Sequence, residues 1–520
     1  MAYPIARSTR RRRTFRQSAL ALVAALGLGF LCAGCGAPVR FPDRPLVAQV
    51  TDAGLLRAYD TNGDKRTDYF TTQDAAGRTV RIAYDTTGDG GPDDFLDLDD
   101  IPLADCRHVV IVLDGIGYDT VEAFRREGHL RLFHPPSRII STFPSMTDVA
   151  MADVFRSVRS LGFEAVYFDH RTERLAGGSA DYLSLKNEAW TRSVDYRANP
   201  IWDPISYLYP DAVFGRELGQ FQKLFDRRDR SSLVAYFVST AGLATRCGLE
   251  GQRRILDLAD RLAERLVWQT RGLVKVTILS DHGHALVRAE RIDFQKFLRQ
   301  KRWRVTDRLQ NDADVVPIEF GLVTYASFAT RRRAALAADL LQHPGVDFVT
   351  YEENDSVIIE KADAKAAIDH RPGRYRYRPL QGDPLGLQPI LDPLKSTGGL
   401  DADGFVADAD LFRLTAAHDY PDPLDRLWRA FHGLTENVPD VIASLKDGYC
   451  AGAASRLAWL PYIASTHGDL QRKSSTAFIM STAGPLLAPT VPAIRSREVP
   501  AALERLTGRP WPCPPKGAHP

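Results

Sequence analysis

The stretch Val274-Lys-Val-Thr-Ile-Leu-Ser-Asp-His-Gly-His284 is an apolar run that ends in an acid and an imidazole side by side. Its β-branched and aliphatic residues, bounded by a Ser-Asp-His-Gly break, predict a buried strand of a parallel sheet. Functional groups of such sheets gather at the carboxyl ends of the strands. Asp281 and His282 therefore lie where a metal or substrate site would be built, and both side chains bind cations. The structural alternative is an Asp that caps the next helix beside an ordinary surface His.

The same pattern recurs along the chain. Residues 107–115 form a continuous apolar run that ends in Asp-Gly, and a helical stretch carrying Val121, Phe124 and Leu130 follows. Other segments are typical of strands or of the helices between them: residues 165–168, 233–238, 320–325 and 477–480, and residues 255–269 and 331–342. Strands that alternate with helices predict an α/β fold, a doubly wound, mostly parallel sheet with helices on both faces.

Two later segments break this alternation. Residues 346–361, split by Glu352-Glu-Asn-Asp355, predict a hairpin that forms a small α+β insertion with the helix before it. Residues 371–417 are rich in Pro, Gly and Asp and predict long surface loops near the site.

Length and charge set outer bounds. A chain of 520 residues can bury a large core and suggests two or more domains. The net charge of +2 is close to neutral, and we therefore expect no nucleic-acid binding.

The N-terminus predicts export. Arg7 and residues 10–13 form a basic region, and residues 19–31 form an apolar run too short to span a bilayer, which favours a secretory signal. Arg12-Arg13-Thr14-Phe15 resembles the twin-arginine export pattern, and Sec export is the alternative.

The end of this segment, Leu31-Cys-Ala-Gly-Cys35, resembles a bacterial lipobox, with Cys32 where Leu is usual. It predicts a lipoprotein of the bacterial cell envelope, bound to the membrane through acylated Cys35 and a tether at residues 36–50. The alternative is cleavage and release into the periplasm. Four further cysteines allow up to two disulfides in that oxidising compartment: Cys106, Cys247, Cys450 and Cys513.

A short internal repeat follows the tether. Residues 57–69 are echoed 25 residues later by residues 82–94, and each copy places oxygen-bearing side chains at its loop: Asp60, Asn62, Asp64 and Asp68, then Asp85, Thr87, Asp89 and Asp93. The pattern resembles calcium-binding loops, in which one tight turn supplies several oxygens, although neither copy has a Glu at the twelfth place. The alternative is a pair of Asx-turn hairpins whose side chains satisfy the backbone.

Three segments of the main domain together predict a metal site. Asp114 ends the first strand, residues 139–147 present hydroxyls before a helix at residues 148–159, and Asp281-His282 ends another strand. Two carboxylates, a hydroxyl and an imidazole make a four-ligand cage for zinc. Coordination lowers the pKa of a bound hydroxyl, so Thr142 can attack as an alkoxide, and the helix N-terminus can hold an anionic substrate.

At this point the sequence resembles the type I phosphodiesterase/nucleotide pyrophosphatase branch of the alkaline phosphatase superfamily. The matching motifs occur in the family's order within residues 107 to about 500: Val112–Gly115, Thr142–Ser145, Ser280–Gly283 and Thr466–Gly468. The resemblance implies that Thr142 is the nucleophile and that Asp114, Thr142, Asp281 and His282 hold one zinc. It also implies that His467 belongs to a second zinc.

The chain then divides into a signal peptide (1–35), a tether (36–50), an Asp-rich repeat (51–105) and an alkaline-phosphatase-like domain (106–510). It departs from the family at the second zinc, because Ala241 and Thr245 stand where the family carries an Asp and a His. The second metal is therefore expected to be absent or weak. Three outcomes stay open: substitution by His284, His418 or Cys247, use of one metal with a positioned cation such as Arg246, or loss of catalysis.

Two functions follow. The first is a metal-dependent phosphodiester or phosphomonoester hydrolase that acts on a phosphorylated small molecule or a lipid head group. The alternative is a catalytically inactive lipoprotein of the same fold that binds an anionic ligand or an envelope partner. Residues 185–225 carry aromatic side chains that either stack on a leaving group or pack a cap: Trp190, Tyr196, Trp202 and Tyr207.

Overall fold

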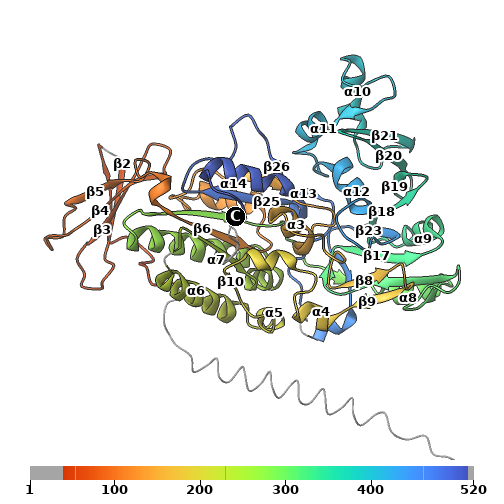
Figure 1. Ribbon diagram of the computed structural model, residues 1–520, viewed down its shortest axis with the longest axis horizontal. Coiled ribbons are helices and arrows are strands. Elements are labelled where there is room, and N and C mark those ends of the chain that lie inside the picture. Colours follow the sequence, from red (N-terminus) through yellow and green to blue (C-terminus); the bar gives the residue numbers. More distant parts are fainter. Residues whose placement is uncertain (1–38, 53, 229, 459, 461, 513–520) are drawn as a thin grey trace, which may run out of the picture.

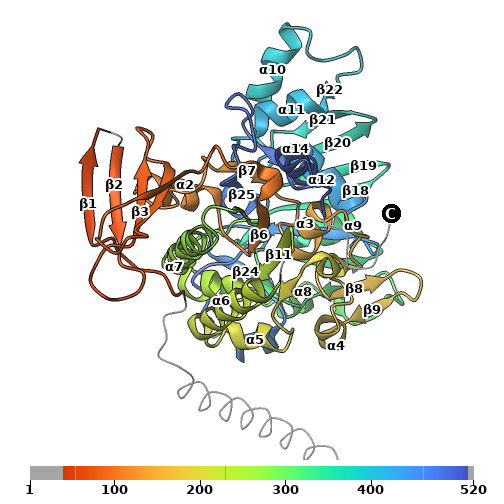
Figure 2. The ribbon, with the colours of Figure 1, turned by 60° about the vertical axis from the view of Figure 1, so that its left-hand side comes forward.

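The computed structural model describes residues 39–52, 54–228, 230–458, 460 and 462–512 (Figure 1). The predicted signal peptide with Cys35, and Cys513, lie outside these ranges. Three bodies follow one another along the long axis: an N-terminal sheet, a central α/β body and a second α/β body that carries the residues coloured teal and light blue (Figures 1 and 2).

The central sheet has seven strands in the order β10-β11-β6-β12-β25-β7-β26. The pairs β10/β11, β11/β6, β6/β12 and β7/β26 are parallel, whereas β25 runs antiparallel to β12 and β7. The strands are β6 Arg107–Leu113, β7 Ser137–Ile140, β10 Tyr196–Arg197, β11 Ser232–Phe237, β12 Val274–Leu279, β25 Thr476–Ser481 and β26 Ile494–Arg495. The predictions at residues 107–113, 233–238, 274–279 and 477–480 thus fall on strands of one sheet.

Helices cover both faces of this sheet because β6 is apolar on both sides. Val109, Ile111 and Leu113 pack with α2 Tyr118–Arg126, α6 Pro210–Arg227 and α7 Ser239–Gln269. Val110 and Val112 face the opposite core, with α3 Thr147–Val154 and α14 Val499–Thr507. The shorter helices of this body are η1 Leu103–Asp105, α4 Ser179–Leu183, η2 Ala189–Ser193, α5 Trp202–Ser206, η3 Ala454–Ala458, α13 Arg472–Ser475 and η4 Ser496–Glu498.

The N-terminal sheet is antiparallel, in the order β1-β2-β3-β4-β5. Its strands are β1 Val47–Thr51, β2 Gly54–Tyr59, β3 Tyr69–Gln73, β4 Thr79–Tyr84 and β5 Asp94–Asp97. The two Asp-rich stretches connect β2 to β3 and β4 to β5. The predicted tether differs from this structure: Val39 and Phe41 are buried in the core shared with α7, and β1 already belongs to the sheet.

The second α/β body is larger than the predicted insertion. Its nine-stranded sheet has the order β14-β15-β17-β23-β18-β19-β20-β21-β22, and the hairpin predicted at residues 346–361 is confirmed as β18 and β19. The strands are β14 Arg304–Val305, β15 Asp314–Ile318, β17 Tyr325–Thr330, β18 Val346–Glu353, β19 Ser356–Glu360, β20 Lys365–Arg371, β21 Arg374–Gln381, β22 Val406–Ala407 and β23 Val441–Leu445. The helices are α8 Phe294–Gln300, α9 Arg333–Leu340, α10 Gln388–Ser396, α11 Asp408–Thr415 and α12 Pro423–Phe431.

Three sequence predictions are corrected here. Residues 371–417 are not long loops, because β21, α10, β22 and α11 lie within them. The run at 165–168 forms β8 Val166–Asp169, which pairs with β9 Arg174–Gly177 outside both large sheets. The run at 320–325 divides between β17 and a small sheet of β13 Glu290–Arg291, β24 Tyr449–Gly452 and β16 Leu322–Val323.

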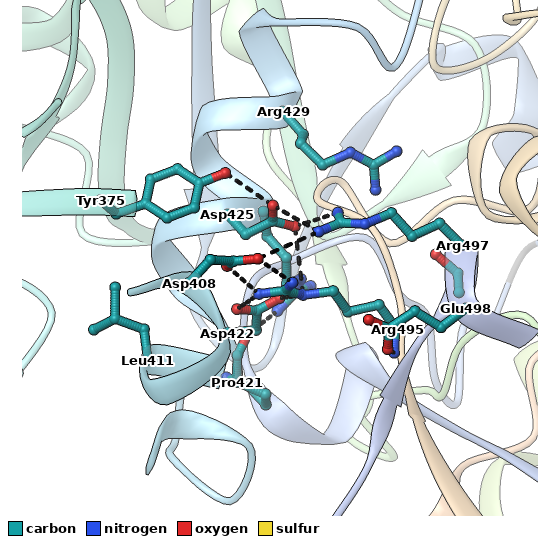
Figure 3. Close-up of polar contacts among 12 residues, drawn as sticks. Tyr375, Asp408, Leu411, Pro421, Asp422, Asp425, Arg429, Arg495, Arg497 and Glu498 are labelled. Atoms are coloured by element: carbon teal, nitrogen blue, oxygen red, sulfur yellow. Dashed lines mark hydrogen bonds and ion pairs between the residues drawn. The ribbon is translucent and has the colours of Figure 1, made fainter. Parts of the chain in front are cut away.

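A buried ion-pair network joins the two α/β bodies (Figure 3). Arg495 of β26 donates to Asp422 at the start of α12 at 2.6 Å and 2.8 Å, and to Asp408 of α11 at 2.6 Å and 2.7 Å. Arg497 donates to Asp425 of α12. Because removing one partner would leave a buried charge uncompensated, this network fixes α12 against the edge of the central sheet.

The structure also bears on the predicted disulfides and on the membrane. Cys106, Cys247 and Cys450 are free thiols. Within the described ranges, no helix has the length and apolar character needed to cross a bilayer.

Candidate functional site

Two carboxylates and an imidazole meet at the carboxyl end of the central sheet. Asp114 directly follows β6, and Asp281 and His282 follow β12, the parallel neighbour of β6. The His282 Nε2 atom lies 3.2 Å from Asp281 Oδ2 and 3.8 Å from Asp114 Oδ1. All three side chains are buried, with exposed fractions of 4 % or less. Among the described residues, the three form one of two groups whose donor atoms are close enough together to hold one metal ion.

The carboxylates of this group are incompletely paired. Asp114 Oδ2 accepts hydrogen bonds from the hydroxyls of Tyr236 and Thr147, but Asp114 Oδ1 and Asp281 Oδ2 have no hydrogen-bond partner among the described residues. Burial, and then the negative charge of Asp281, raise the pKa of Asp114 well above its ordinary value. Buried, unpaired carboxylate oxygens are costly unless a cation compensates them, so this donor set fits a divalent metal.

The hydroxyl next to this group is that of Thr147. Its Oγ1 lies 3.4 Å from Asp114 Oδ2 and 3.3 Å from His282 Nε2. Thr147 is the first residue of α3, so its side chain and the free amide groups of the first helical turn face the same place. Helix α3 therefore begins one residue earlier than predicted. Its first residue presents the Thr147 hydroxyl, which was predicted only as part of the segment 139–147.

The Thr142 side chain is buried in the loop before α3. Its hydroxyl donates to the Pro144 carbonyl oxygen at 2.9 Å, and its own carbonyl accepts from Arg426 Nη2 at 2.8 Å. Arg426, a buried residue of α12, also donates to Ser145 Oγ at 3.1 Å. Thr142 thus belongs to the loop that leads into α3, and the second α/β body holds that loop in place.

Three imidazoles form the second group. The donor atoms of His282, His284 and His467 lie within 4.8 Å of one another, and the rings of His282 and His467 stack with centroids 3.8 Å apart. Burial, and then the neighbouring imidazoles, lower the pKa of both His284 and His467 well below the ordinary value. The structure therefore places the predicted His467 beside the carboxylate group and adds His284.

Ala241 and Thr245 lie in the first turns of α7, as the sequence analysis placed them after the strand. Both line the same cavity as Asp114, Thr147 and His467. Neither side chain offers a good metal donor. Of the substitutes considered from the sequence, only His284 joins a potential metal group in the described part of the chain; His418 and Cys247 do not.

The cavity at this site has a volume of about 180 Å³ and a charged lining. Arg197 pairs with Glu188 at 3.1 Å and with Asp203 at 2.9 Å. Burial raises the pKa of Glu188 to about 8 and that of Glu164 to about 7. The lining also includes Asp148, Tyr182, Tyr207, Tyr236 and Arg456.

The aromatic residues predicted for a leaving-group surface have different environments. Trp190 is fully buried and stacks on Phe155, Tyr196 packs in the core beneath α6, and the guanidinium of Arg216 lies over the Trp202 ring. Of the four, Tyr207 alone lines the cavity. Packing therefore explains most of this cluster.

In the Asp-rich loops, carboxylate side chains accept hydrogen bonds from backbone amides of the same loop. Asp60 Oδ1 accepts from the amides of Asn62 and Gly63, and Asp60 Oδ2 accepts from that of Lys65. The second loop repeats this pattern around Asp85. These are the contacts expected of the Asx-turn alternative, and calcium binding by the residues named above stays a prediction.

No known family profile matches the sequence, and no curated protein matches it. Solved structures do. Murine ectonucleotide pyrophosphatase/phosphodiesterase 5 is 12 % identical, with 79 % of this chain and 97 % of that chain covered and a TM-score of 0.42. Phosphonoacetate hydrolase from Sinorhizobium meliloti 1021 is 12 % identical, with 82 % and 99 % covered and a TM-score of 0.44.

Proposed function

We propose that this protein is a metal-dependent hydrolase of phosphoric esters, either diesters or monoesters, with Thr147 rather than Thr142 as the nucleophile. One observation carries the proposal: the Thr147 hydroxyl lies 3.3 Å from His282 Nε2 and 3.4 Å from Asp114 Oδ2, at the start of a helix and beside unpaired buried carboxylates. The proposed nucleophile thus lies five residues after the one predicted from the sequence, within the hydroxyl-bearing segment 139–147.

Asp114, Thr147, Asp281 and His282 are the residues that would hold a metal ion here, and zinc suits this mixed oxygen and nitrogen donor set. When bound, such an ion lowers the pKa of a coordinated hydroxyl and polarises the phosphoryl group. The neighbouring contacts keep the donors in place. Tyr236 donates its hydroxyl to Asp114 Oδ2, and the Gly115 amide donates to Asp281 Oδ1 at 3.1 Å.

The proposed reaction has two steps. The Thr147 oxygen attacks phosphorus, the bond from phosphorus to the leaving alcohol breaks, and that alcohol departs with a proton. Water then attacks the phosphothreonine and restores the hydroxyl. The free amides of the first turn of α3 favour the negative charge of the transferred group, and the cavity beside them accommodates the leaving alcohol.

Replacing each threonine separately by alanine tests which of the two is the nucleophile. Thr147→Ala removes the attacking oxygen, so turnover of bis(4-nitrophenyl) phosphate and 4-nitrophenyl phosphate falls by about 10³-fold or more. Thr142→Ala removes one hydrogen bond of about 1 kcal/mol in the loop and keeps turnover within about tenfold of the wild type. The Thr147→Ser variant serves as a second control, since it retains a hydroxyl. Full activity in Thr147→Ala with loss in Thr142→Ala would restore the original assignment.

The second candidate function is a non-catalytic protein that binds an anionic ligand or an envelope partner. The observation that favours it is the pair Ala241 and Thr245, which offers no strong metal donor at the cavity wall. Mass spectrometry of the protein quenched in acid during turnover separates the two functions. A phosphorylated Thr147 supports the enzyme, whereas bound metal without turnover of either ester supports the binding protein.

We further propose that the protein acts in the bacterial cell envelope, anchored through Cys35 or released after cleavage. The support is the sequence of residues 1–35 alone. Mass spectrometry of the N-terminal peptide from the native host distinguishes the two forms, since a diacylglyceryl group on Cys35 marks the anchored one.

A further inference from the structure

We propose that His284 and His467 bind a second divalent cation beside the first one, at a position that Ala241 and Thr245 leave without strong donors. The inference deepens the proposed function by supplying a second metal site from residues of this chain. It concerns metal binding, which is measurable whether or not the protein turns over an ester.

One nitrogen of each clustered imidazole contacts a protein oxygen. In His282, His284 and His467 the Nδ1 atom contacts, in that order, Gly283 O at 3.0 Å, Ser465 Oγ at 3.2 Å and Ser145 O at 2.8 Å. A metal-bound His commonly donates its second ring N–H to a carbonyl or hydroxyl oxygen, which fixes the ring. Carbonyl oxygens only accept hydrogen bonds, so Nδ1 of His282 and of His467 carries the proton and their Nε2 atoms keep a lone pair for a metal. One ring nitrogen of each of the three residues lies within 4.8 Å of the other two.

His284 shows the clearest sign of a missing ligand. Its Nε2 atom has no hydrogen-bond partner in the ranges that the structure describes, and only 1 % of the residue is exposed. A core histidine held only for packing would be expected to satisfy both nitrogens, because an unpaired buried polar atom costs about 1–3 kcal/mol. His284 instead belongs to the group with His282 and His467, and its ring centroid lies 5.0 Å from that of His467.

The backbone leaves room for this imidazole. A Cβ atom at Gly115 would lie 2.6 Å from His284 Nε2, and Gly115 has a φ of +75°, a conformation that favours glycine. Gly115 follows Asp114 directly, so the same turn presents a carboxylate to the first group and admits His284 to the second.

His282 lies in both groups, but its single free nitrogen can bind one ion at a time. With His282 assigned to the carboxylates, the second cation has two protein nitrogens, and its other positions are open to water or to a phosphate oxygen. A borderline cation such as zinc suits imidazole donors. Placed next to the first ion, it would stabilise oxygens of the phosphoryl group as in a two-metal site.

Metal counting tests this inference. The purified full chain, stripped with chelator, is dialysed against Zn²⁺ with and without inorganic phosphate, and the bound ions are counted by mass spectrometry. We expect two ions per chain in the wild type with phosphate present and one in His284→Asn. Asn can still reach Ser465 through its amide but lacks the Nε2 donor. The matched control is His343→Asn, which keeps two ions, because His343 lies beside Phe294 and Phe297, away from both groups.

Cobalt provides an independent readout. Titration with Co²⁺ gives two phases of visible absorption in the wild type and one in both His284→Asn and His467→Asn, with thermal unfolding used to verify that each variant is folded. One ion per chain in the wild type, or two in His284→Asn, would overturn the inference. The same data test the proposed function independently. Two bound ions without ester turnover would refute the hydrolase and support the second metal site. Ester turnover with one bound ion would support the hydrolase and refute the second metal site.

Discussion

The chain has two carboxylate-rich regions, and they differ in what their oxygens contact. In the Asp-rich loops the side chains are half-buried or exposed and accept hydrogen bonds from nearby amides, as Asp85 does from Gly88 and Gly90 at 2.6 Å and 2.7 Å. At the end of the central sheet, Asp114 and Asp281 are buried and each keeps one oxygen without a partner among the described residues.

The difference shows where a cation is needed. Backbone hydrogen bonds lower the pKa of Asp85, so this carboxylate is stable as an anion by itself. Burial raises the pKa of Asp114 well above its ordinary value, and the nearby Asp281 raises it further. A loop of the first kind folds without a cation, whereas the buried pair depends on a positive charge to remain ionised.

The largest expected effect comes from removing a donor of the buried pair. Asp281→Asn keeps the shape of the side chain and removes its charge, so the first metal ion is lost and ester turnover falls by about 10³-fold or more. Asp85→Asn, the matched change in a loop, leaves the Zn²⁺ count and the turnover unchanged. Equal losses in the two variants would contradict the distinction between the regions.

The next largest effect is expected from adding metal ligands at the cavity wall. In a His284→Asn background, Ala241→Asp with Thr245→His adds a carboxylate and an imidazole at the wall of the cavity that His467 also lines. We expect the Zn²⁺ count to return from one to two and the rate to rise by about tenfold or more over the single variant. The control is Ala241→Asn with Thr245→Gln, which adds comparable bulk without strong donors. A count that stays at one would show that the first turns of α7 do not face the metal.

The sequence predicted the meeting of Asp114 with Asp281 and His282 because two local patterns and one topological rule were enough. Both runs are apolar strands that end in polar residues, and adjacent parallel strands bring their carboxyl ends together. His284 also lay within the opening motif, two residues after His282. The sequence left His284 as one of three possible substitutes at the second site, and the structure places its ring beside Gly115 and His467.

The proposed preference for Thr147 over Thr142 depends on a contact that is distant in the sequence. The backbone of the loop before α3 is held by Arg426, more than 280 residues later, and its path decides which hydroxyl reaches Asp114. Residues 371–417 were misjudged for a different reason. Arg374-Tyr-Arg-Tyr-Arg378 alternates strictly, and its two tyrosines face the core of the second α/β body, but the surrounding Pro, Gly and Asp residues outweighed this strand signal.

The contributions of Glu164, a carboxylate with a raised pKa, and Asp85, a carboxylate with a lowered pKa, should change with pH in opposite directions. Burial raises the folded-state pKa of Glu164 to about 7, so its contribution to stability is fully present below its unfolded-state pKa of about 4.5 and is lost as the pH rises through 7. In chelator-treated protein, the Tm of Glu164→Gln relative to wild type therefore increases by about 3 °C between pH 5 and pH 8.

The counterpart in the Asp-rich loops is Asp85, whose folded-state pKa is lowered. Its contribution is present above its unfolded-state pKa and is lost as the pH falls through the folded-state value. The Tm of Asp85→Asn relative to wild type therefore rises on acidification below pH 4. Parallel trends in Asp85→Asn and Glu164→Gln would contradict the assignment of their opposite environments.

The smallest expected effect concerns calcium and the folding of the Asp-rich loops. Because Asp60 and Asp85 already bind the amides of their own turns, the N-terminal sheet folds without a cation, and Tm values in EGTA and in millimolar CaCl₂ agree within about 2 °C. Differential scanning calorimetry of the full chain measures this, with Asp60→Asn plus Asp85→Asn as the variant that removes the first ligand of each loop. A calcium-dependent rise of 5 °C or more that disappears in this variant would show that the loops, like the buried pair, depend on a bound cation for their stability.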